Sequence, residues 1–266
     1  MDVVSLGFRT DLMLRRLAGS SITDRGDHLV VRTLQNPHFY WGNFILVSAA
    51  AEDPSNAAQW RAAFAAAFPD AQHVAIGLDG TSTDAACLAR YRAAGLTPDV
   101  STVLAAGALQ EPARPLPGAD LRRLGTDADW REALELSHEL DDRSPSEQLF
   151  TERLFTERRL AESRELVESG RAAWFAAFVD GRMRCSLGLC TDGGEVARYQ
   201  SVVTHPQFRG RGLASWLVFE AGRYGLDVLG ARTLVIVADP DYVAIRIYRA
   251  LGFAAVEHQT QFQHPA

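Results

Sequence analysis

The chain has 266 residues, which exceeds the 100–200 residues of a typical domain. Hydrophobic residues make up 47% and charged residues 23%, an ordinary globular mixture that excludes disorder for most of the chain. The formal net charge of −6 excludes a chain-wide basic surface for nucleic acid or anionic lipid. The sequence contains no lysine, which excludes Schiff-base catalysis and a lysine-containing phosphate loop.

Three cysteines occur, at Cys87, Cys185 and Cys190, without the paired spacing of a disulfide framework or a zinc site. Charged residues interrupt the segment 1–17, so no signal peptide is predicted. No run of 18 apolar residues is present. We therefore expect a cytoplasmic protein with no membrane span and no bound metal.

The first half of the chain alternates between helical and strand-like patterns. Helices are predicted over 8–17, 56–68 and 84–94, and strands over 28–33, 39–47, 73–78 and 101–106. The half therefore closes with the order strand, helix, strand, helix, strand.

A proline-rich segment divides the sequence. Residues 110–118 contain three prolines and one glycine, so they cannot continue a helix or a central strand. We interpret the segment as a linker between a domain at 1–109 and a domain at 119–266.

The second half predicts a larger α/β (α+β) domain with a mixed twisted sheet flanked by helices. Strands are predicted over 119–123, 172–179, 183–190, 196–204, 233–238 and 253–262, and helices over 127–140, 147–168, 211–229 and 240–252. Asp239 and Pro240 have the residue types of an N-cap and a first helical position. The strand–helix–strand order over 196–238 predicts a right-handed parallel crossover.

The two halves share a short sequence echo. Residues 91–96 read Tyr-Arg-Ala-Ala-Gly-Leu and residues 248–253 read Tyr-Arg-Ala-Leu-Gly-Phe, 157 positions later. The same offset pairs Asp84 with Asp241. Either the domain is duplicated, or both segments converged on a glycine that ends a helix.

A glycine-containing loop connects the strand at 196–204 with the long helix that follows. Gly210 and Gly212 let the backbone approach a ligand, while Arg209 and Arg211 add positive charge. The unpaired N–H groups of the following helix favour an anion, above all a phosphate or pyrophosphate. The alternative is that the glycines only shape the turn into the helix. A dinucleotide-binding fingerprint would need a third glycine at position 215, which is serine.

The residues of this loop resemble a known family. Gln207-x-x-Gly210-x-Gly212 resembles the Q/R-x-x-G-x-G/A signature of the GNAT superfamily of N-acetyltransferases. Asp241-x-x-Ala-x-x-Ile-Tyr248-x-x-x-Gly-Phe253 resembles the second signature of that family, in the same order along the chain. The resemblance covers 119–266, and 1–108 is similar to a degenerate repeat without the loop signature. It implies tandem GNAT-like domains, of which the second uses acetyl-CoA as co-substrate.

The resemblance also implies roles for individual residues. Main-chain groups of the preceding strand would bind pantetheine, and the loop would bind the pyrophosphate; these residues are Val202, Val203, Thr204, Arg209, Gly210, Arg211, Gly212, Leu213 and Ala214. Tyr248 would protonate the departing thiolate, although a core aromatic role is the alternative. Asp241 stands where the family has asparagine. Glu195 is the candidate general base, with an exposed turn residue or a water relay as alternatives.

Two further segments bear on the acceptor. The aromatic run at 39–44 either packs in a core or forms a wall for the acceptor. Acidic residues occur on the predicted helix at 127–140 and just after it. They form either a solvated face or a site that attracts a cationic amine. These residues are Glu132, Glu135, Glu139, Asp141 and Asp142.

The expected function is an acetyl-CoA-dependent N-acetyltransferase in which the amine attacks directly in a ternary complex. The alternative is a non-catalytic acyl-CoA-binding or regulatory module. A tRNA-dependent aminoacyltransferase fits less well because the chain is acidic and the loop signature is intact. The expected partner is a small-molecule or peptide amine, with no nucleic acid and no membrane, and the fold alone does not choose among amines.

Overall fold

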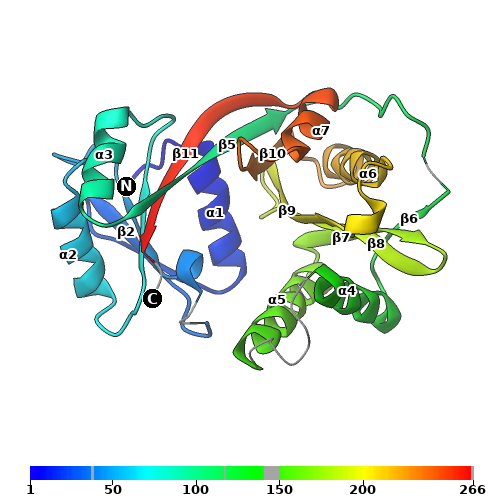
Figure 1. Cartoon of the computed structure of the whole chain (residues 1–266), viewed down its shortest axis with the longest axis horizontal. Coiled ribbons are helices and arrows are strands. Elements are labelled where there is room, and N and C mark those ends of the chain that lie inside the picture. Colours follow the sequence, from blue (N-terminus) through cyan, green and yellow to red (C-terminus); the bar gives the residue numbers. More distant parts are fainter. Residues whose placement is uncertain (37–38, 117, 141–149, 265–266) are drawn as a thin grey trace. The chain divides into compact units, whose positions relative to one another are not determined.

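A computed structural model describes residues 1–36, 39–116, 118–140 and 150–264, with the backbone alone described over 150–155. The chain forms two compact units (Figure 1). Unit 1 comprises Met1–Leu104, Val237–Ile245 and Ala255–Ala266. Unit 2 comprises Ala105–Ile236 and Arg246–Ala254.

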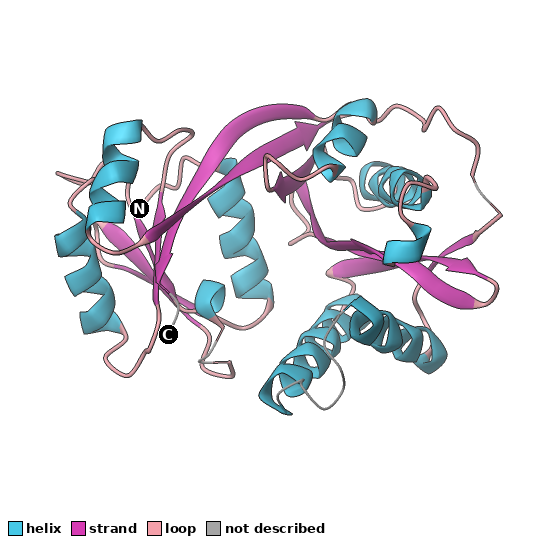
Figure 2. Cartoon of the chain, in the orientation of Figure 1, coloured by secondary structure: helices cyan, strands magenta, loops and turns pink. Residues whose placement is uncertain are grey.

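Unit 1 contains a mixed sheet in the order β1-β2-β3-β4-β11-β5. The strands are β1 (Ser21–Asp24), β2 (His28–Arg32), β3 (Phe44–Val47), β4 (Val74–Leu78), β5 (Thr97–Ala106) and β11 (Ala254–His264). β3 and β4 are parallel, whereas β1–β2, β2–β3 and β4–β11 are antiparallel. Helix α1 (Leu6–Leu17) covers one face, and α2 (Ala57–Ala67) and α3 (Ala85–Ala93) cover the other (Figure 2).

Unit 2 contains a sheet in the order β10-β9-β8-β7-β6. The strands are β6 (Asp120–Arg123), β7 (Ala172–Val179), β8 (Arg182–Cys190), β9 (Val196–Thr204) and β10 (Thr233–Ala238). β9 and β10 are parallel and the other neighbours are antiparallel. Helix α6 (Leu213–Asp227) lies on one face, and α4 (Asp127–Leu140) and α5 (Phe150–Glu168) lie on the other (Figure 1). The predicted mixed sheet flanked by helices is confirmed.

The C-terminal strand lies in unit 1, although the sequence placed it in the second domain. β11 pairs with β4 from Thr260↔Leu78 to His264↔Val74. Phe262 is fully buried and stacks on Tyr91 with ring centroids 3.8 Å apart. A local hydrophobic pattern does not show which distant strand will be the partner, so the pairing of β11 with β4 could not be predicted from the sequence.

The proline-rich segment forms part of unit 2. The Trp216 indole donates to the carbonyl oxygen of Arg114 at 2.8 Å. The Gln110 amide donates to the carbonyl oxygen of Leu251 at 2.9 Å. Gln110 and Arg114 therefore both have hydrogen-bond partners within unit 2.

Two predicted elements begin four or five residues later than expected. The strand expected over 39–47 begins at Phe44, because Tyr40–Gly42 forms a 3-10 turn. The helix expected from Pro240 is α7 (Ala244–Ala250), because the Asp239 carboxylate accepts the Asp241 amide at 2.9 Å and closes a turn instead of capping a helix.

The two units repeat one topology. In each, an antiparallel pair of strands leads through a helix into a parallel neighbour, as β2-β3-α2-β4 in unit 1 and β8-β9-α6-β10 in unit 2. The echoed hexapeptides also match in detail. The amide of Leu96 donates to Tyr91 and the amide of Phe253 donates to Tyr248, at 3.0 and 3.1 Å. This shared topology favours duplication over convergence on a cap.

Candidate active site

Strand β9 contains a bulge near its C-terminal end. Its register with β8 runs Cys185↔Thr204 and Ser186↔Val203, then continues as Gly188↔Gln200. One extra residue therefore lies on β9 between Gln200 and Val203. Ser201 has φ 50°, a left-handed conformation that is uncommon for serine and serves to re-aim the backbone.

The end of β9 also separates from β10. The register between these parallel strands covers Val196–Arg198 on β9 and Thr233–Val235 on β10. The last six residues of β9, 199–204, extend beyond that register. Within the described residues, this segment of β9 presents a main-chain edge on which an extended ligand could pair.

The loop after β9 is built to leave backbone donors exposed. Gly210 has φ 73° and Gly212 has φ 90°, conformations that glycine adopts without strain. Gly212 is the N-cap of α6 and supplies no side-chain cap. The first N–H groups of a 15-residue helix therefore point out of the loop with the positive end of its dipole.

Arginine side chains add positive charge to the same loop. Arg209 is exposed, and its Nε donates to the carbonyl oxygen of Thr204 at 3.2 Å. The Arg211 guanidinium lies 4.7 Å from the ring centroid of Phe208, and that of Arg184 lies 4.9 Å from it. The loop can thus bind an anion through backbone and guanidinium donors together.

Tyr248 comes from α7 and is 5% exposed. Its ring centroid lies 6.3 Å from that of Phe253, which in turn lies 5.9 Å from Tyr199 on β9. Burial, with a smaller contribution from Tyr248, raises the pKa of the Tyr199 phenol. The structure therefore groups Tyr248 with Tyr199 of β9, three residues before the segment 202–204 that the sequence analysis selected.

Glu195 is not brought together with these residues. It precedes β9, six residues before Ser201, which corresponds to about 20 Å of extended strand. Its carboxylate is exposed and pairs with Arg232 at 3.0 Å. This position fits an exposed turn residue better than it fits a general base.

Asp241 lies in the turn before α7, where its side chain is exposed and its amide donates to Asp239. It belongs to unit 1, whereas the loop at 205–212 belongs to unit 2. A place for Asp241 in the same site stays a prediction from the sequence.

Two glutamates of α4 pair with arginines of β8, and Glu135 is exposed. Glu132 accepts from Arg182 at 3.0 Å, and Glu139 accepts from Arg184 at 2.8 Å. Asp141 and Asp142 lie outside the described residues. The described pairs favour a structural role for this face over attraction of a cationic amine.

The aromatic segment packs within unit 1. Phe44 is 1% exposed in the core, and Trp41 packs against that core. The Trp41 indole donates to Gln263 at 3.3 Å. Tyr40 stacks on His73 with centroids 4.4 Å apart. These contacts favour the core interpretation.

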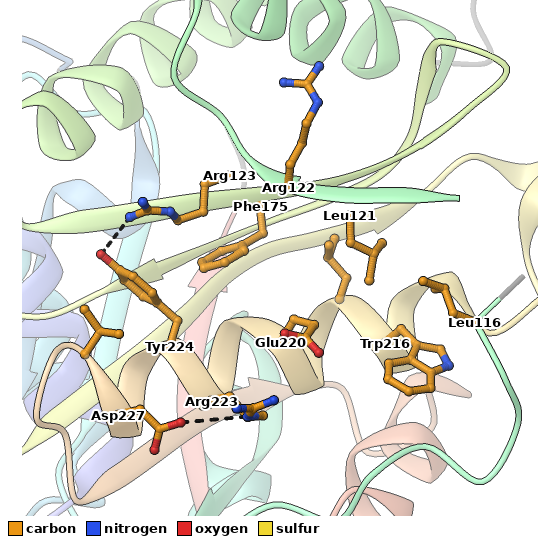
Figure 3. Close-up of a pocket in the computed structure, with 12 residues that line it drawn as sticks. Leu116, Leu121, Arg122, Arg123, Phe175, Trp216, Glu220, Arg223, Tyr224 and Asp227 are labelled. Carbon is orange, nitrogen blue, oxygen red and sulfur yellow. Dashed lines mark hydrogen bonds and ion pairs between the residues drawn. The ribbon is translucent and has the colours of Figure 1, made fainter. Parts of the chain in front are cut away.

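Two cavities of unit 2 flank its sheet. One, of about 330 Å³, lies between α4, α5 and the sheet, and is lined by Ser201 and Val203 of β9. Arg159 of α5 also lines this cavity, and no sequence motif marks it. The other, of about 540 Å³, lies between α6 and β6 and contains none of the predicted site residues (Figure 3). There Arg123 donates to the Tyr224 hydroxyl at 2.8 Å.

Among the described residues, no group of three or more His, Cys, Asp or Glu side chains could hold a metal ion. The described helices also include none that is long and apolar enough to cross a membrane.

Comparison with known proteins identifies the domain. Residues 130–253 match the model of the acetyltransferase (GNAT) family. The chain contains a GNAT domain. A comparison with curated proteins finds no match.

Solved structures share the whole architecture. A GCN5-related N-acetyltransferase from Kribbella flavida is 17% identical, with a TM-score of 0.65 over 99% of this chain and 97% of that one. A functionally unknown conserved protein from Staphylococcus epidermidis is 12% identical, with a TM-score of 0.69 over 91% and 92%. A tandem GNAT protein from the clavulanic acid biosynthesis pathway is 18% identical, with a TM-score of 0.55 over 92% and 83%. The predicted tandem fold is confirmed, with the N-terminal half similar to a GNAT repeat and the C-terminal half a GNAT domain.

Proposed function

We propose that this protein is an acetyl-CoA-dependent N-acetyltransferase, with a single acetyl-CoA site in the GNAT domain. The observation that carries the proposal is the junction of β9 and α6. There a bulged strand end beyond the β10 register leads directly into a glycine loop at a helix N-terminus. This junction offers an extended edge for pantetheine and a donor-rich loop for pyrophosphate.

The residues at this junction fit the parts of acetyl-CoA in order. Val202, Val203 and Thr204 would pair their main-chain groups with the pantetheine amides. Arg209–Ala214 would bind the pyrophosphate through backbone N–H groups and two guanidinium groups. Both glycines have positive φ, a conformation that glycine adopts without strain and that lets the loop backbone approach the pyrophosphate.

The reaction is a direct transfer between two bound substrates. The nitrogen lone pair of a neutral amine forms a bond to the thioester carbonyl carbon, and the carbon–sulfur bond then breaks. A backbone N–H of the bulged segment would stabilise the negative charge that develops on the carbonyl oxygen. Tyr248 would give its phenolic proton to the departing thiolate, and the amine would lose its proton to water.

Unit 1 lacks the features that carry this proposal. The loop after β3 contains no glycine from Ser48 to Asn56. Side chains of the neighbouring helices bond to its carbonyl groups, since Tyr91 of α3 donates to the Pro54 carbonyl at 2.9 Å and Trp60 of α2 donates to the Asp53 carbonyl at 3.0 Å. Tyr91 stands at the position that Tyr248 occupies in unit 2. We therefore propose one acetyl-CoA site for each chain.

Calorimetric titration with acetyl-CoA tests the proposal. The wild-type protein should bind one acetyl-CoA per chain, and Gly210→Glu should weaken binding by at least about 10-fold, because the new carboxylate repels the pyrophosphate and loop contacts are lost. Gly193→Glu is the matched control. Gly193 has φ 87°, and a Cβ there, as at Gly210, meets nothing within 4 Å.

Equal affinities of the two glutamate variants would contradict the placement of the site. Binding at one site without acetyl transfer to any amine would favour the alternative, a non-catalytic acyl-CoA-binding module. Binding of two acetyl-CoA molecules per chain would contradict the proposal that unit 1 has no acetyl-CoA site.

A further inference from the structure

A cluster of side chains joins the loop at 205–212 to helix α4. We define this loop anchor as Glu139 of α4, Arg184 of β8, and His205 and Phe208 of the loop. All four residues belong to unit 2. The loop anchor therefore links a helix on one face of the sheet to the loop that leads into α6 on the other face (Figure 1).

The carboxylate of Glu139 lies at the centre of these contacts. Its Oε2 accepts a hydrogen bond from Nη1 of Arg184 at 2.8 Å and lies 3.4 Å from Nε2 of His205. Its Oε1 accepts from Nη2 of Arg182 at 3.4 Å. One side chain of α4 thus contacts both strand β8 and the first residue of the loop.

These charges are partly shielded from water. The exposed fractions of the side chains are 33% for Glu139, 18% for Arg184 and 13% for His205. Partly buried pairs are screened less than exposed ones, and a hydrogen bond between charged groups is stronger than a neutral one. Within the described part of the chain, the Nε of Arg184 is buried without a hydrogen-bond partner. Loss of the Glu139 carboxylate would leave the same guanidinium with a second unpaired donor.

His205 connects Glu139 with the rest of the loop. Its amide donates to the carbonyl oxygen of Arg184 at 2.9 Å. Its Nδ1 accepts from the Gln207 amide at 3.3 Å, so a neutral imidazole carries its proton on Nε2, the atom that faces Glu139. The imidazole packs edge-on against the ring of Phe208, with centroids 5.6 Å apart. A change at Glu139 would therefore reach Phe208 through the His205 ring.

Phe208 connects the loop anchor to one of the proposed pyrophosphate ligands. The guanidinium groups of Arg184 and Arg211 lie 4.9 and 4.7 Å from its ring centroid, both within the range of a cation–π interaction. Arg211 is one of the two arginines that we propose bind the pyrophosphate. A guanidinium held against a ring has less side-chain freedom to lose when a ligand binds, which favours affinity.

We propose that Glu139 is a positioning residue for acetyl-CoA, which acts through Arg184, His205 and Phe208 on the loop that binds the pyrophosphate. This proposal rests on the acetyltransferase function proposed above. The carboxylate would raise affinity without contact to the coenzyme, by keeping Phe208 and Arg211 in the arrangement that binds the anion.

Calorimetric titration with acetyl-CoA tests this role. Glu139→Gln keeps the size of the side chain and removes its charge, so we expect the Kd for acetyl-CoA to rise by about 10-fold, the value of one charge-assisted hydrogen bond. Glu139→Asp returns the charge on a shorter side chain and should restore part of the affinity.

Glu132→Gln is the matched control on the same helix. The hydrogen bonds of Glu132 go to the Arg182 side chain and to the Met183 amide, at 3.0 Å each, and not to the loop anchor. Both glutamine variants lose an ion pair between α4 and β8, so a general loss of stability would affect them alike. We expect Glu132→Gln to leave the Kd for acetyl-CoA unchanged.

Two fragments of the coenzyme localise the effect. Adenosine 3′-phosphate 5′-diphosphate carries the pyrophosphate without pantetheine, and S-acetylpantetheine carries the thioester arm without the pyrophosphate. Glu139→Gln should weaken binding of the first fragment and leave binding of the second unchanged, because the loop anchor acts on the pyrophosphate loop.

A double-mutant cycle with Arg184→Gln tests the path from Glu139 to the loop. If Glu139 acts through Arg184, the two single variants remove the same contact, so their effects on the Kd should not add in the double variant. Fully additive effects would overturn the path through Arg184.

Each failure has a distinct signature. Absence of acetyl-CoA binding by the wild type would overturn the proposed function itself. Wild-type binding with an unchanged Kd in Glu139→Gln, or with the same rise in Glu132→Gln, would overturn only the role of Glu139. Equal weakening of both coenzyme fragments would also overturn that role, because the effect would then extend beyond the pyrophosphate loop.

Discussion

The Tyr199 hydroxyl on β9 donates a hydrogen bond to the carbonyl oxygen of Val218 on α6 at 2.7 Å. This bond ties the strand that carries the bulge to the helix whose N-terminus forms the anion loop. Gly222, one turn after Val218, lets the phenol approach, because a Cβ there would lie 2.4 Å from the Tyr199 hydroxyl. Strand and helix thus hold the two halves of the proposed coenzyme site in one arrangement.

Removing the hydroxyl with Tyr199→Phe should lower the free energy of unfolding by about 1 kcal/mol, the net contribution of one buried hydrogen bond. Gly222→Ala should cost more, about 1–3 kcal/mol, since the methyl group would also meet Leu109 and Leu234. Denaturant unfolding followed by circular dichroism measures the free energy of unfolding of both variants. A Gly222→Ala variant as stable as the wild type would show that α6 can move away from β9.

Tyr248→Phe tests the proposed acid. Because the phenol would give its proton to the leaving thiolate, we expect kcat to fall by about 100-fold or more, with the Kd for acetyl-CoA unchanged. Steady-state kinetics and calorimetry on the same preparation separate the two quantities. An unchanged kcat would return Tyr248 to the role of a core aromatic, whose ring packs near Phe253.

Sequence patterns predicted the features of the fold that depend on residues close together along the chain. Strand β9 and strand β10 have the predicted bounds, and Gly210 and Gly212 both have the positive φ for which glycine is needed. The echo at Tyr91 and Tyr248 marks two helix ends with the same hydrogen bonds. Each of these features is set by residues within a few positions of one another.

Features that depend on distant pairing were missed. The partner of β11 is β4, more than 170 residues earlier in the chain by the register His264↔Val74. The bulge at Ser201 has no sequence signal, because serine is uncommon at positive φ and the register with β8 creates the extra residue. Arg159 belongs to a cavity assembled from α4, α5 and three strands, so no short motif could select it.

Glu195→Gln should leave kcat/KM within about 2-fold of the wild-type value across the pH range. Its carboxylate is exposed, pairs with Arg232 and lies at the opposite end of β9 from the bulge. An exposed ion pair contributes at most about 1 kcal/mol, so the melting temperature should change little. A large fall in kcat at low pH that the variant removes would restore Glu195 as a general base.

Asp129 predicts how unit 2 responds to acid. Burial raises the pKa of this carboxyl, but hydrogen bonds from the Gly125 and Thr126 amides and from Arg122 outweigh burial and lower the pKa overall. A lowered pKa in the folded state stabilises the fold above the unfolded value of about 3.9, and this stabilisation is lost as the pH falls through the folded pKa.

Asp129→Asn should therefore lower the free energy of unfolding at pH 7 by about 1–3 kcal/mol, because it removes the charge from a buried hydrogen-bonded group. The difference from the wild type should shrink as the pH falls below about 4, where the wild-type carboxyl also becomes neutral. Asp127→Asn is the control, since Asp127 also begins α4 but is exposed and pairs with Arg164 at the surface. Thermal unfolding at pH 7 and near pH 3 measures both variants. If both variants lose the same free energy of unfolding at pH 7, the start of α4 is stabilised by negative charge near the helix N-terminus rather than by the buried hydrogen bonds of Asp129.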